Sequence, residues 1–397
     1  MAQTVRPVRA APRPLALVLA GTMLLDALEV SVLVPVLPAL GERFGAGPGQ
    51  AQWLLTAFAA GFGAVLPAGP WLAARFGRRR VYLVALLCFA AASVVAGVTG
   101  DFAVLVAARL VKGAGAALTA PGGLAVLTAA VPEGARQRRA VALYAAFGAA
   151  GFTVGLLVSG ALAGAGVRWV LLFPAPVALV LAGLAAAVVP PDAPRTPVPE
   201  FPRRLVRNGP FARSAFGAAA LNGTYLTTLL VTTYALHERG WSPLAVAAGC
   251  LPACLPVALT SPVTARLVAA FGTARLIAAG AVAAAAGYAW QLLPLPSAGY
   301  PRLAPTLVLV GIGFVFAFGA LNVQAVAALP AAARARAVPV YQSCVQFGAV
   351  AVLLAGVAVA GLDGPLWTVV AAVGAAGAAV AVAGWRRAST ESRGGSR

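Results

Sequence analysis

The chain has 397 residues, of which 61% are hydrophobic and only 10% are charged, and its mean hydropathy is +0.90. This balance excludes an ordinary soluble globular domain and is typical of a protein that crosses the membrane many times. The net charge of +19 comes from arginines in short clusters between apolar runs, whereas nucleic-acid binding needs basic residues gathered on one water-exposed face. We therefore expect a lipid bilayer and no nucleic acid as partner.

Apolar runs recur along nearly the whole chain, and each reaches the roughly 20 residues that cross the hydrocarbon core as a helix. Cutting them at charged, proline-rich or glycine-rich junctions predicts twelve transmembrane helices, at 15–40, 51–74, 80–99, 102–130, 140–164, 167–189, 213–236, 243–270, 273–295, 303–330, 337–361 and 364–385. Residues 1–14 and 386–397 are predicted to be cytoplasmic tails. A proline-rich cytoplasmic linker at 190–212 is predicted to separate an N-terminal half, 15–189, from a C-terminal half, 213–385.

The basic residues test this topology, because cytoplasmic loops hold an excess of Lys and Arg. With the N-terminus inside, 23 of the 29 basic residues fall in segments on the inner side. The outer loops hold only Arg43, Arg168, Arg239 and Arg302, and the remaining two basic residues lie within the fourth span. The distribution predicts a multi-pass protein of the plasma (inner) membrane with both ends in the cytoplasm.

A weak internal repeat supports the same division. The second span runs into ARFGRRRVYL and the eighth into VAAFGTARLI, and aligning their Phe-Gly pairs at 76–77 and 271–272 gives an offset of 195 residues. Two six-helix halves related by such a repeat are a transporter architecture, in which the substrate site lies near mid-membrane between the halves. We expect an all-α membrane fold of two pseudo-symmetric six-helix halves.

Several motifs resemble the major facilitator superfamily, and more narrowly its actinobacterial drug:proton antiporters of the fourteen-helix type. LLDALEVSVLVPVLPAL resembles the signature of the first helix, and QWLLTAF resembles the start of the second. PWLAARFGRRR resembles the cytoplasmic loop motif, ARLVKGAGAALTAPGGLAVL the fourth helix, GFTVGLLVSGAL the antiporter motif of the fifth, and VRWVLLFPAPVAL the start of the sixth. The resemblance covers most of the chain.

The resemblance implies a transporter that works by alternating access, and it assigns roles to particular residues. Asp26 falls on the acidic position of the first helix. The cytoplasmic loop motif falls on Arg75, Gly77, Arg78 and Arg79, and the antiporter motif on Gly151, Gly155, Ser159 and Gly160.

The chain also departs from the family pattern. The Gly that opens the loop motif and the Asp that precedes its arginine are Pro70 and Ala74 here, which removes a carboxylate that helps to latch the cytoplasmic face. The Gln of the fourth helix is Lys112, and the Gly-Pro of the antiporter motif reads Gly155-Leu156, with Ser159 on a later Gly position. The short linker stands where fourteen-helix members carry two more helices.

Four charged residues, Asp26, Glu29, Arg109 and Lys112, lie deep in predicted spans. Each costs roughly 2.5 to 3.5 kcal/mol at a helix centre, so each is a candidate functional residue with a partner. At about 1.5 Å per residue, Asp26 and Lys112 lie roughly 15 to 16 Å from the cytoplasmic side, and Glu29 and Arg109 roughly 20 to 21 Å. We therefore expect Asp26 to pair with Lys112 and Glu29 with Arg109, as a ladder or as a shared network.

Two interpretations of these charges remain open. In one, permanent salt bridges fix the first span against the fourth. In the other, the four residues couple transport to protons, because a carboxylate takes up a proton on the more acidic side and releases it on the other. The family resemblance favours the second interpretation for Asp26, whereas Glu29 has only the physical argument. Protons are the expected coupling ion, and no cofactor, metal or catalytic residue is expected.

Substrate contacts are expected in the C-terminal half. The candidates are Asn222, Tyr225, Asn322 and Gln324, and interhelical hydrogen bonding is an equally open role for each. Gln342 and Gln346 of the eleventh span are more typical of such interhelical bonding. His237, the only histidine, is expected to be a loop residue at the outer end of the seventh span.

The leading hypothesis is proton-coupled export of small amphipathic organic compounds, such as drugs or antibiotics, by a monomer. The alternative within transport is a proton symporter or facilitator for a small polar solute, which the scarcity of polar residues in the expected cavity disfavours. A receptor, an assembly partner or an embedded enzyme is disfavoured because the sequence shows no nucleophile and base pair, metal cluster or nucleotide loop. The charge of the substrate stays open, since two cations already match the two acids.

Overall fold

The structure is a computed structural model that describes residues 12–191, 208–260, 264–294, 299–327, 329–360 and 365–394. Every regular element among these residues is a helix. The predicted linker lies largely outside the described residues, as do most of the N-terminal tail and the last three residues of the chain. The predicted all-α fold is confirmed.

The first half contains α1 to α10, joined by short turns. Their bounds are Pro12–Ser31 (α1), Leu37–Phe44 (α2), Pro48–Ala51 (α3), Trp53–Val65 (α4), Gly69–Phe76 (α5), Arg78–Val98 (α6), Phe102–Ala130 (α7), Ala135–Ala163 (α8), Val167–Leu172 (α9) and Pro174–Val188 (α10). Two short 3₁₀ helices, Val34–Val36 and Leu66–Ala68, join α1 to α2 and α4 to α5.

The second half contains α11 to α17. Their bounds are Gly209–His237 (α11), Pro243–Thr260 (α12), Thr264–Phe271 (α13), Thr273–Leu292 (α14), Tyr300–Ala327 (α15), Ala331–Ala360 (α16) and Pro365–Gly394 (α17). Each of the twelve predicted spans corresponds to one long helix or to consecutive shorter ones. The predicted ends are approximate, since α11 begins before 213 and α17 continues well beyond 385.

Prolines account for the breaks within the first, second and sixth spans. Pro35 and Pro67 lie in the two 3₁₀ helices, and Pro174 begins α10 directly after α9. A proline has no backbone N–H to donate and its ring clashes with the preceding turn, which favours a kink or a break in the helix at these positions. Hydropathy alone does not reveal these breaks because the flanking residues are equally apolar.

Among the described residues, ten helical segments are long and apolar enough to cross a membrane. The two predicted spans that do not meet this measure correspond to α11 and α14. In α11 several buried threonines lower the hydropathy, and the hydroxyls of Thr224 and Thr228 donate to carbonyls one turn earlier, both at 2.8 Å. This bonding satisfies these two hydroxyls inside the bundle, which lowers the cost of burying a less apolar helix there.

The internal repeat is visible in the backbone. Gly77 joins the eight-residue α5 to α6, and Gly272 joins the eight-residue α13 to α14. Both have positive φ, +93° and +78°, with similar ψ of 141° and 153°. Only glycine adopts this conformation without strain. The two glycines therefore mark equivalent positions in the two halves, 195 residues apart as predicted.

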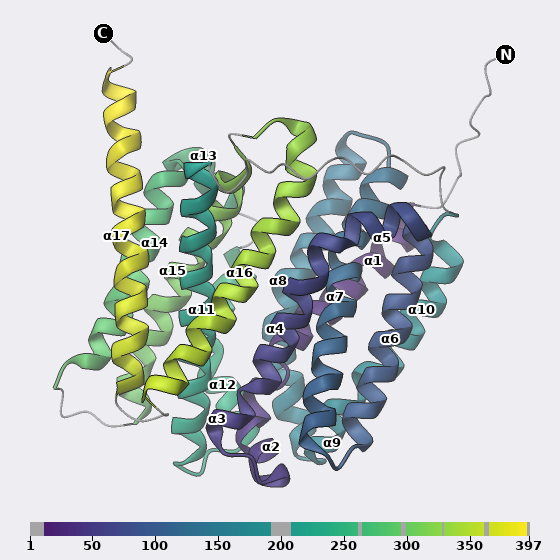
Figure 1. The fold of residues 1–397 in the computed structure, drawn as a ribbon, viewed down its shortest axis with the longest axis horizontal. Coiled ribbons are helices and arrows are strands. Elements are labelled where there is room, and N and C mark those ends of the chain that lie inside the picture. Colours follow the sequence, from purple (N-terminus) through teal and green to yellow (C-terminus); the bar gives the residue numbers. More distant parts are fainter. Residues whose placement is uncertain are drawn as a thin grey trace.

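The two halves lie side by side (Figure 1). Helices of the first half, purple to blue, occupy one side of the view, and those of the second half, teal to yellow, occupy the other. The halves meet where α4 packs on α16 and where α8 packs on α12. Buried residues from both halves form one continuous apolar core across this boundary.

Candidate functional site

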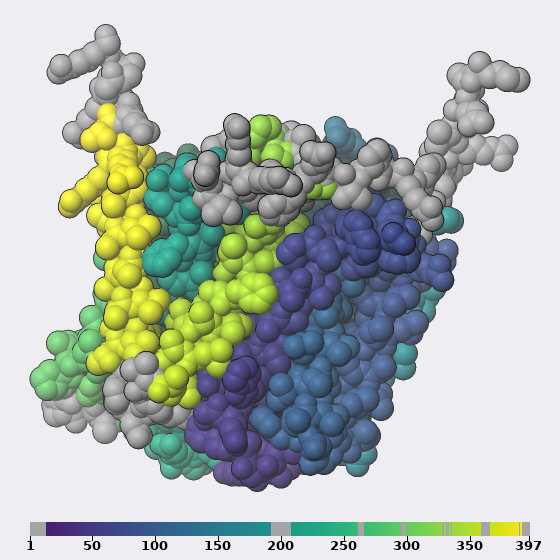
Figure 2. All heavy atoms as spheres, viewed as in Figure 1, coloured from purple at the N-terminus to yellow at the C-terminus, as the bar shows by residue number. Residues whose placement is uncertain are grey.

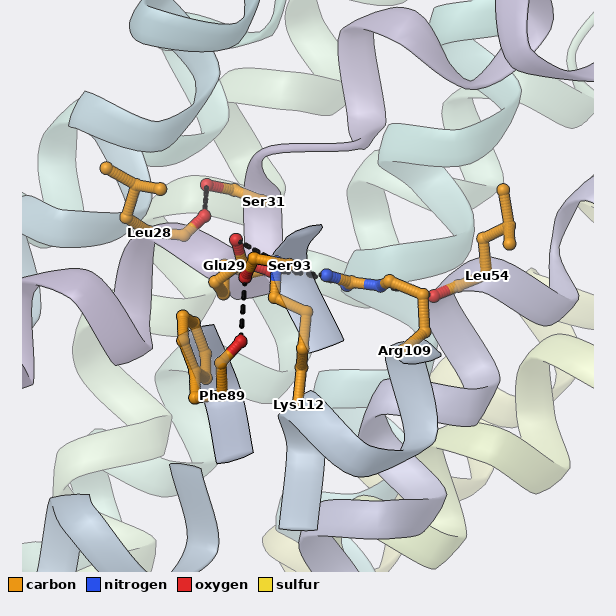
Figure 3. Close-up of polar contacts among 8 residues, drawn as sticks. All are labelled: Leu28, Glu29, Ser31, Leu54, Phe89, Ser93, Arg109 and Lys112. Carbon is orange, nitrogen blue, oxygen red and sulfur yellow. Dashed lines mark hydrogen bonds and ion pairs between the residues drawn. The ribbon is translucent and has the colours of Figure 1, made fainter. Parts of the chain in front are cut away.

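Glu29 of α1 is the centre of a buried ion cluster with two basic residues of α7 (Figure 3). Its Oε2 accepts a hydrogen bond from Arg109 Nη1 at 2.5 Å, and its Oε1 accepts one from Lys112 Nζ at 2.6 Å. Arg109 Nη2 also donates to the backbone carbonyl oxygen of Glu29 at 3.1 Å. The relative exposure of these residues is 0% for Glu29 and 1% for each cation, so the charges are balanced by contact rather than by water.

Neighbouring helices supply the other contacts of the two cations. Arg109 Nε donates to the carbonyl oxygen of Leu54 in α4 at 3.0 Å, and its guanidinium lies 4.7 Å from the centre of the Phe58 ring. The Lys112 ammonium lies 4.9 Å from the ring centre of Phe89 in α6. Cation–π contacts and hydrogen bonds to carbonyls offset part of the cost of burying two positive charges.

These contacts require the backbones of α4 and α7 to lie almost in contact. A Cβ atom at Gly113 would overlap the carbonyl oxygen of Phe58, and one at Gly61 would overlap that of Leu110. The two glycines therefore permit the close crossing that brings the carbonyl oxygen of Leu54 within reach of Arg109. Small residues at helix contacts commonly serve this purpose in membranes.

Asp26 lies outside this ion cluster. Its Oδ2 accepts a hydrogen bond from the hydroxyl of Thr119 in α7 at 2.7 Å, and no basic side chain of the described residues forms an ion pair with it. Its residue exposure is 4%. The expected pairing of Asp26 with Lys112 is wrong, because Lys112 bonds to Glu29 instead. The expected pairing of Glu29 with Arg109 is confirmed.

The expected antiporter motif in α8 packs on the segment of α1 that carries both carboxylates. A Cβ atom at Gly151 would lie 2.7 Å from the carbonyl oxygen of Leu24, and one at Gly155 would lie 2.5 Å from that of Leu28. Ser159, one turn later, is fully buried. The motif therefore lets α8 approach the backbone of α1 on both sides of Asp26.

The expected substrate-binding amides all bond to other side chains of their own half. The three hydrogen bonds are Asn222 Nδ2 to Gln346 Oε1 at 3.5 Å, Gln342 Nε2 to Asn322 Oδ1 at 3.3 Å, and Ser214 Oγ to Gln324 Oε1 at 3.0 Å. All five amide side chains are only partly buried. They form a polar zone shared by α11, α15 and α16, and the structure does not bring this zone into contact with the ion cluster of α1 and α7.

Tyr225, the fourth substrate-binding candidate, lies in an aromatic cluster. Its hydroxyl donates to Cys254 Sγ at 3.1 Å, and its ring centre lies 4.7 Å from that of Phe314. On its other side it meets Phe152 of α8 at 5.8 Å, in an edge-on arrangement. Tyr225 thus connects the two halves through aromatic contact near the middle of both helices.

The cytoplasmic loop motif ends α5 and begins α6. Gly77 makes the turn, and Arg78 is the first residue of α6. Arg79 Nη2 donates to the carbonyl oxygen of Ala186 at 2.5 Å. Ala186 is in the last turn of α10, where carbonyl oxygens lack helical partners and a cation is favoured. This arginine therefore fastens α6 to the end of α10.

Arg75 has a different environment. Its guanidinium lies 5.6 Å from the ring centre of Trp71 and 5.7 Å from that of Phe76. The position before it is Ala74, which offers no carboxylate. Aromatic faces therefore hold this arginine where the family pattern provides an acid.

Three further contacts across the boundary join the halves. His237 Nε2 and Glu42 Oε1 are 3.0 Å apart, which gives the only histidine a partner in the opposite half rather than the expected plain loop role. Ser343 of α16 donates to the carbonyl oxygen of Gly63 in α4 at 2.7 Å. Gly160 of the antiporter motif packs on the first turn of α12. No sequence signal relates these positions, because they are brought together only by the packing of the halves.

A comparison with known families finds the Major Facilitator Superfamily over residues 19–353. Among solved structures, the nucleoside transporter NupG superimposes with a TM-score of 0.72 at 15% identity, covering 93% of this chain and 98% of that one. At this identity the likeness shows the fold alone.

Curated relatives match parts of the chain. The puromycin resistance protein pur8 of Streptomyces alboniger is 36% identical over 176 residues, which is 44% of this chain and 35% of the relative. The cephamycin export protein CmcT of Amycolatopsis lactamdurans is 33% identical over 234 residues, 58% of this chain and 46% of the relative. The MFS-type transporter EfpA of Mycobacterium tuberculosis is 34% identical over 165 residues, which is 42% of this chain and 31% of the relative. The matched part thus spans less than half the length of each relative.

Proposed function

The chain belongs to the Major Facilitator Superfamily and is a multi-pass membrane transporter, and from this we propose that it exports small amphipathic organic compounds in exchange for protons. The names of two partial relatives, a puromycin resistance protein and a cephamycin export protein, support export of antibiotics. Both ends of the chain are proposed to be cytoplasmic, on the strength of the basic-residue distribution. The protein is proposed to act as a monomer in the plasma (inner) membrane.

The observation that carries the proposal is the separation of roles between two carboxyl groups. Glu29 already has two cations in contact, so its charge is balanced by ion pairing. Asp26 has a hydroxyl from Thr119 and no cation among the described residues. A buried carboxylate without a cation is costly, whereas a protonated carboxyl needs no counter-charge. Asp26 is therefore the proton carrier, and Glu29 with its two cations holds α1 against α7.

The proposed cycle follows from this separation. Protonation of Asp26 from the outer side removes an unbalanced charge and allows the halves to repack around the site. On the inner side, hydration restores the carboxylate and the proton leaves. A two-state equilibrium shifts only when a group interacts differently in the two states. The change in the charge of Asp26 between its protonated and deprotonated forms is therefore what couples proton flow to the movement of the halves.

The C-terminal half supplies the proposed substrate contacts. The amides of Asn222, Asn322 and Gln324 offer donors and acceptors without net charge. Tyr225, with Phe314 beside it, offers aromatic surface. A few polar groups beside apolar and aromatic surface are the usual make-up of a site for small organic ligands. This composition suits an amphipathic compound better than a strongly polar solute.

The test uses purified protein in proteoliposomes that contain a pH gradient. We expect Asp26→Asn to lose gradient-driven accumulation of puromycin, or of another amphipathic compound that the wild type moves, by at least about ten-fold, or about 1.4 kcal/mol. Exchange of substrate against substrate needs no net proton movement, so the same variant should retain it. This contrast separates a coupling defect from a binding or folding defect.

The matched control is Asp101→Asn. Asp101 is exposed and accepts from the backbone N–H of Val104 at the start of α7, a capping role that Asn performs equally well. The proposal fails if Asp26→Asn drives accumulation as well as this control does. Accumulation only when the gradient is reversed would instead identify a symporter.

A further inference from the structure

A pair of pockets lies within the C-terminal half, away from the ion cluster of α1 and α7. Two adjoining pockets run between α11, α14, α15 and α17, and each holds about 350 Å³ of empty space that includes open solvent. These helices lie together at one end of the molecule (Figure 1). The two pockets share lining residues, namely Gly217, Ile277, Leu321, Gly377 and Ala381. They are therefore one groove, called here the α17 groove.

The mid-membrane end of the α17 groove, near Tyr288 and Thr224, carries no free polar group among its lining residues. Tyr288 of α14 packs its ring on Gly374 of α17, where an added Cβ would lie 2.5 Å from Tyr288 Cδ2. The Tyr288 hydroxyl donates to Thr224 Oγ1 at 2.8 Å, and Thr224 donates in turn to a backbone carbonyl. Both hydroxyls are thus satisfied, and a ligand meets only apolar surface at this end.

The length of the groove matches one leaflet of a bilayer. Along α11 its lining runs from Arg213 to Thr224, and along α17 from Gly374 to Trp385. Eleven residues of helix rise about 16 to 17 Å. Half of a hydrocarbon core about 30 Å thick is about 15 Å. The groove therefore matches in length one acyl chain of a single leaflet, from the headgroup level to the membrane centre.

The mouth of the groove combines a cation with an interfacial aromatic ring. Arg213 lines it, is only partly buried, and forms no hydrogen bond or ion pair with the described residues. Trp385, 39% exposed, stands opposite on α17, and the exposed Arg386 and Arg387 follow it. Tryptophan prefers the headgroup level of a bilayer, and clustered arginines attract anionic lipids. The yellow α17 lies at the edge of the molecule (Figure 2).

We propose that the α17 groove binds an anionic phospholipid of the leaflet that faces the arginine-rich end of α17, with its headgroup on Arg213 and one acyl chain along the groove. Small residues on the facing helices keep the groove open, since a Cβ added at Gly377 would lie in ordinary contact with Ala220 Cβ, at 3.5 Å. The guanidinium of Arg213, which has no polar partner among the described residues, supplies the charge selectivity. The groove shares Gln324 with the proposed substrate contacts, but lipid binding in it does not depend on coupling to protons.

The test is native mass spectrometry of the full chain released from nanodiscs that contain equal amounts of phosphatidylglycerol and phosphatidylethanolamine. We expect the wild type to retain one phosphatidylglycerol molecule in preference to phosphatidylethanolamine. One basic residue near the surface contributes about 1 kcal/mol to binding of an anionic lipid, so Arg213→Gln should lower this preference about five-fold. Arg213→Lys should restore most of it.

Two further variants separate a groove from a diffuse basic surface. Gly377→Leu fills the groove and should lower retention of both lipids, although every arginine remains. Arg136→Gln removes an exposed arginine of α8 in the other half and should leave retention unchanged. Melting temperatures of all variants show whether each is folded. Equal retention of phosphatidylglycerol by wild type, Arg213→Gln and Gly377→Leu would overturn the proposal. It would also be overturned if the wild type were a dimer that Gly377→Leu alone disrupts, because the groove would then be covered by a second copy of the chain.

Discussion

Glu29 bonds to two cations at once, and this makes it the most consequential single charge in the described structure. Removing its charge leaves Arg109 and Lys112 buried beside a neutral group. Breaking a buried pair by removing one partner is strongly destabilising because the remaining charge has no water to replace the lost contact. Removing the charge of Asp26 strands no buried cation among the described residues, since the partner of Asp26 is the neutral Thr119 hydroxyl.

We therefore expect Glu29→Gln to lower the free energy of unfolding by about 3–5 kcal/mol. Asp26→Asn should cost less than about 1 kcal/mol, because the amide oxygen still accepts from Thr119. Chemical unfolding of both variants in detergent measures the difference. Adding Lys112→Met to Glu29→Gln should recover part of the loss, since one stranded cation is removed. Equal destabilisation by Glu29→Gln and Asp26→Asn would contradict the assigned division of roles.

The four intramembrane charges could be predicted from the sequence, but their pairing could not. The position of a residue along a span predicts its depth in the membrane, and Asp26 and Lys112 are predicted at the same depth. The rotation of α1 and α7 about their axes is set by neighbours such as Gly61, Gly113 and Gly151, whose partners are distant in sequence. Thr119 gave no signal, because a helical threonine usually bonds to its own backbone.

At the scale of helices, the sequence predicts which segments span the membrane because apolar length is a strong signal. The motif in α8 was recognised by its glycines, and its contact with α1 follows from their lack of side chains. The breaks at Pro35 and Pro67 and the extension of α17 beyond 385 were not predicted. Hydropathy indicates which segments lie in the membrane, but it does not indicate the residues at which the helical hydrogen bonding ends.

The crossing of α4 and α7 provides a test at this scale. In Gly113→Ala the added methyl group would overlap the carbonyl oxygen of Phe58. The helices must separate, which weakens the contacts of Arg109 with α4. We expect a loss of about 1–3 kcal/mol in unfolding free energy, the usual cost of overpacking, as measured by chemical unfolding in detergent.

Gly183→Ala in α10 is the matched control for this crossing. Gly183 is exposed and helical, and an added Cβ there meets nothing within 4 Å. Alanine in a helix is favoured over glycine by roughly 0.5–1 kcal/mol, so this variant should be neutral or slightly more stable. If Gly113→Ala is as stable as Gly183→Ala, the two backbones are not in the contact described.

For the whole molecule, the contacts that join the halves include the pair of Glu42 and His237. Glu42 lies in α2 and His237 ends α11, both on the side that the basic residues predict to be outside. An exposed pair of this kind contributes at most about 1 kcal/mol, so it does not lock the halves by itself. The pair does indicate that the halves are in contact on this side, and alternating access requires them to separate here in another state of the cycle.

We expect a short, cleavable, membrane-impermeant bis-maleimide to join Glu42→Cys to His237→Cys and to arrest transport. The exposed Cys88 and Cys344 are first replaced by Ser so that only the introduced thiols react. Added outside right-side-out vesicles, the linker should abolish counterflow in the double variant, and cleavage should restore it. Each single-cysteine variant, treated identically, should keep its activity. Full transport by the joined protein would show that the halves do not separate here, and reaction only from inside would reverse the proposed orientation.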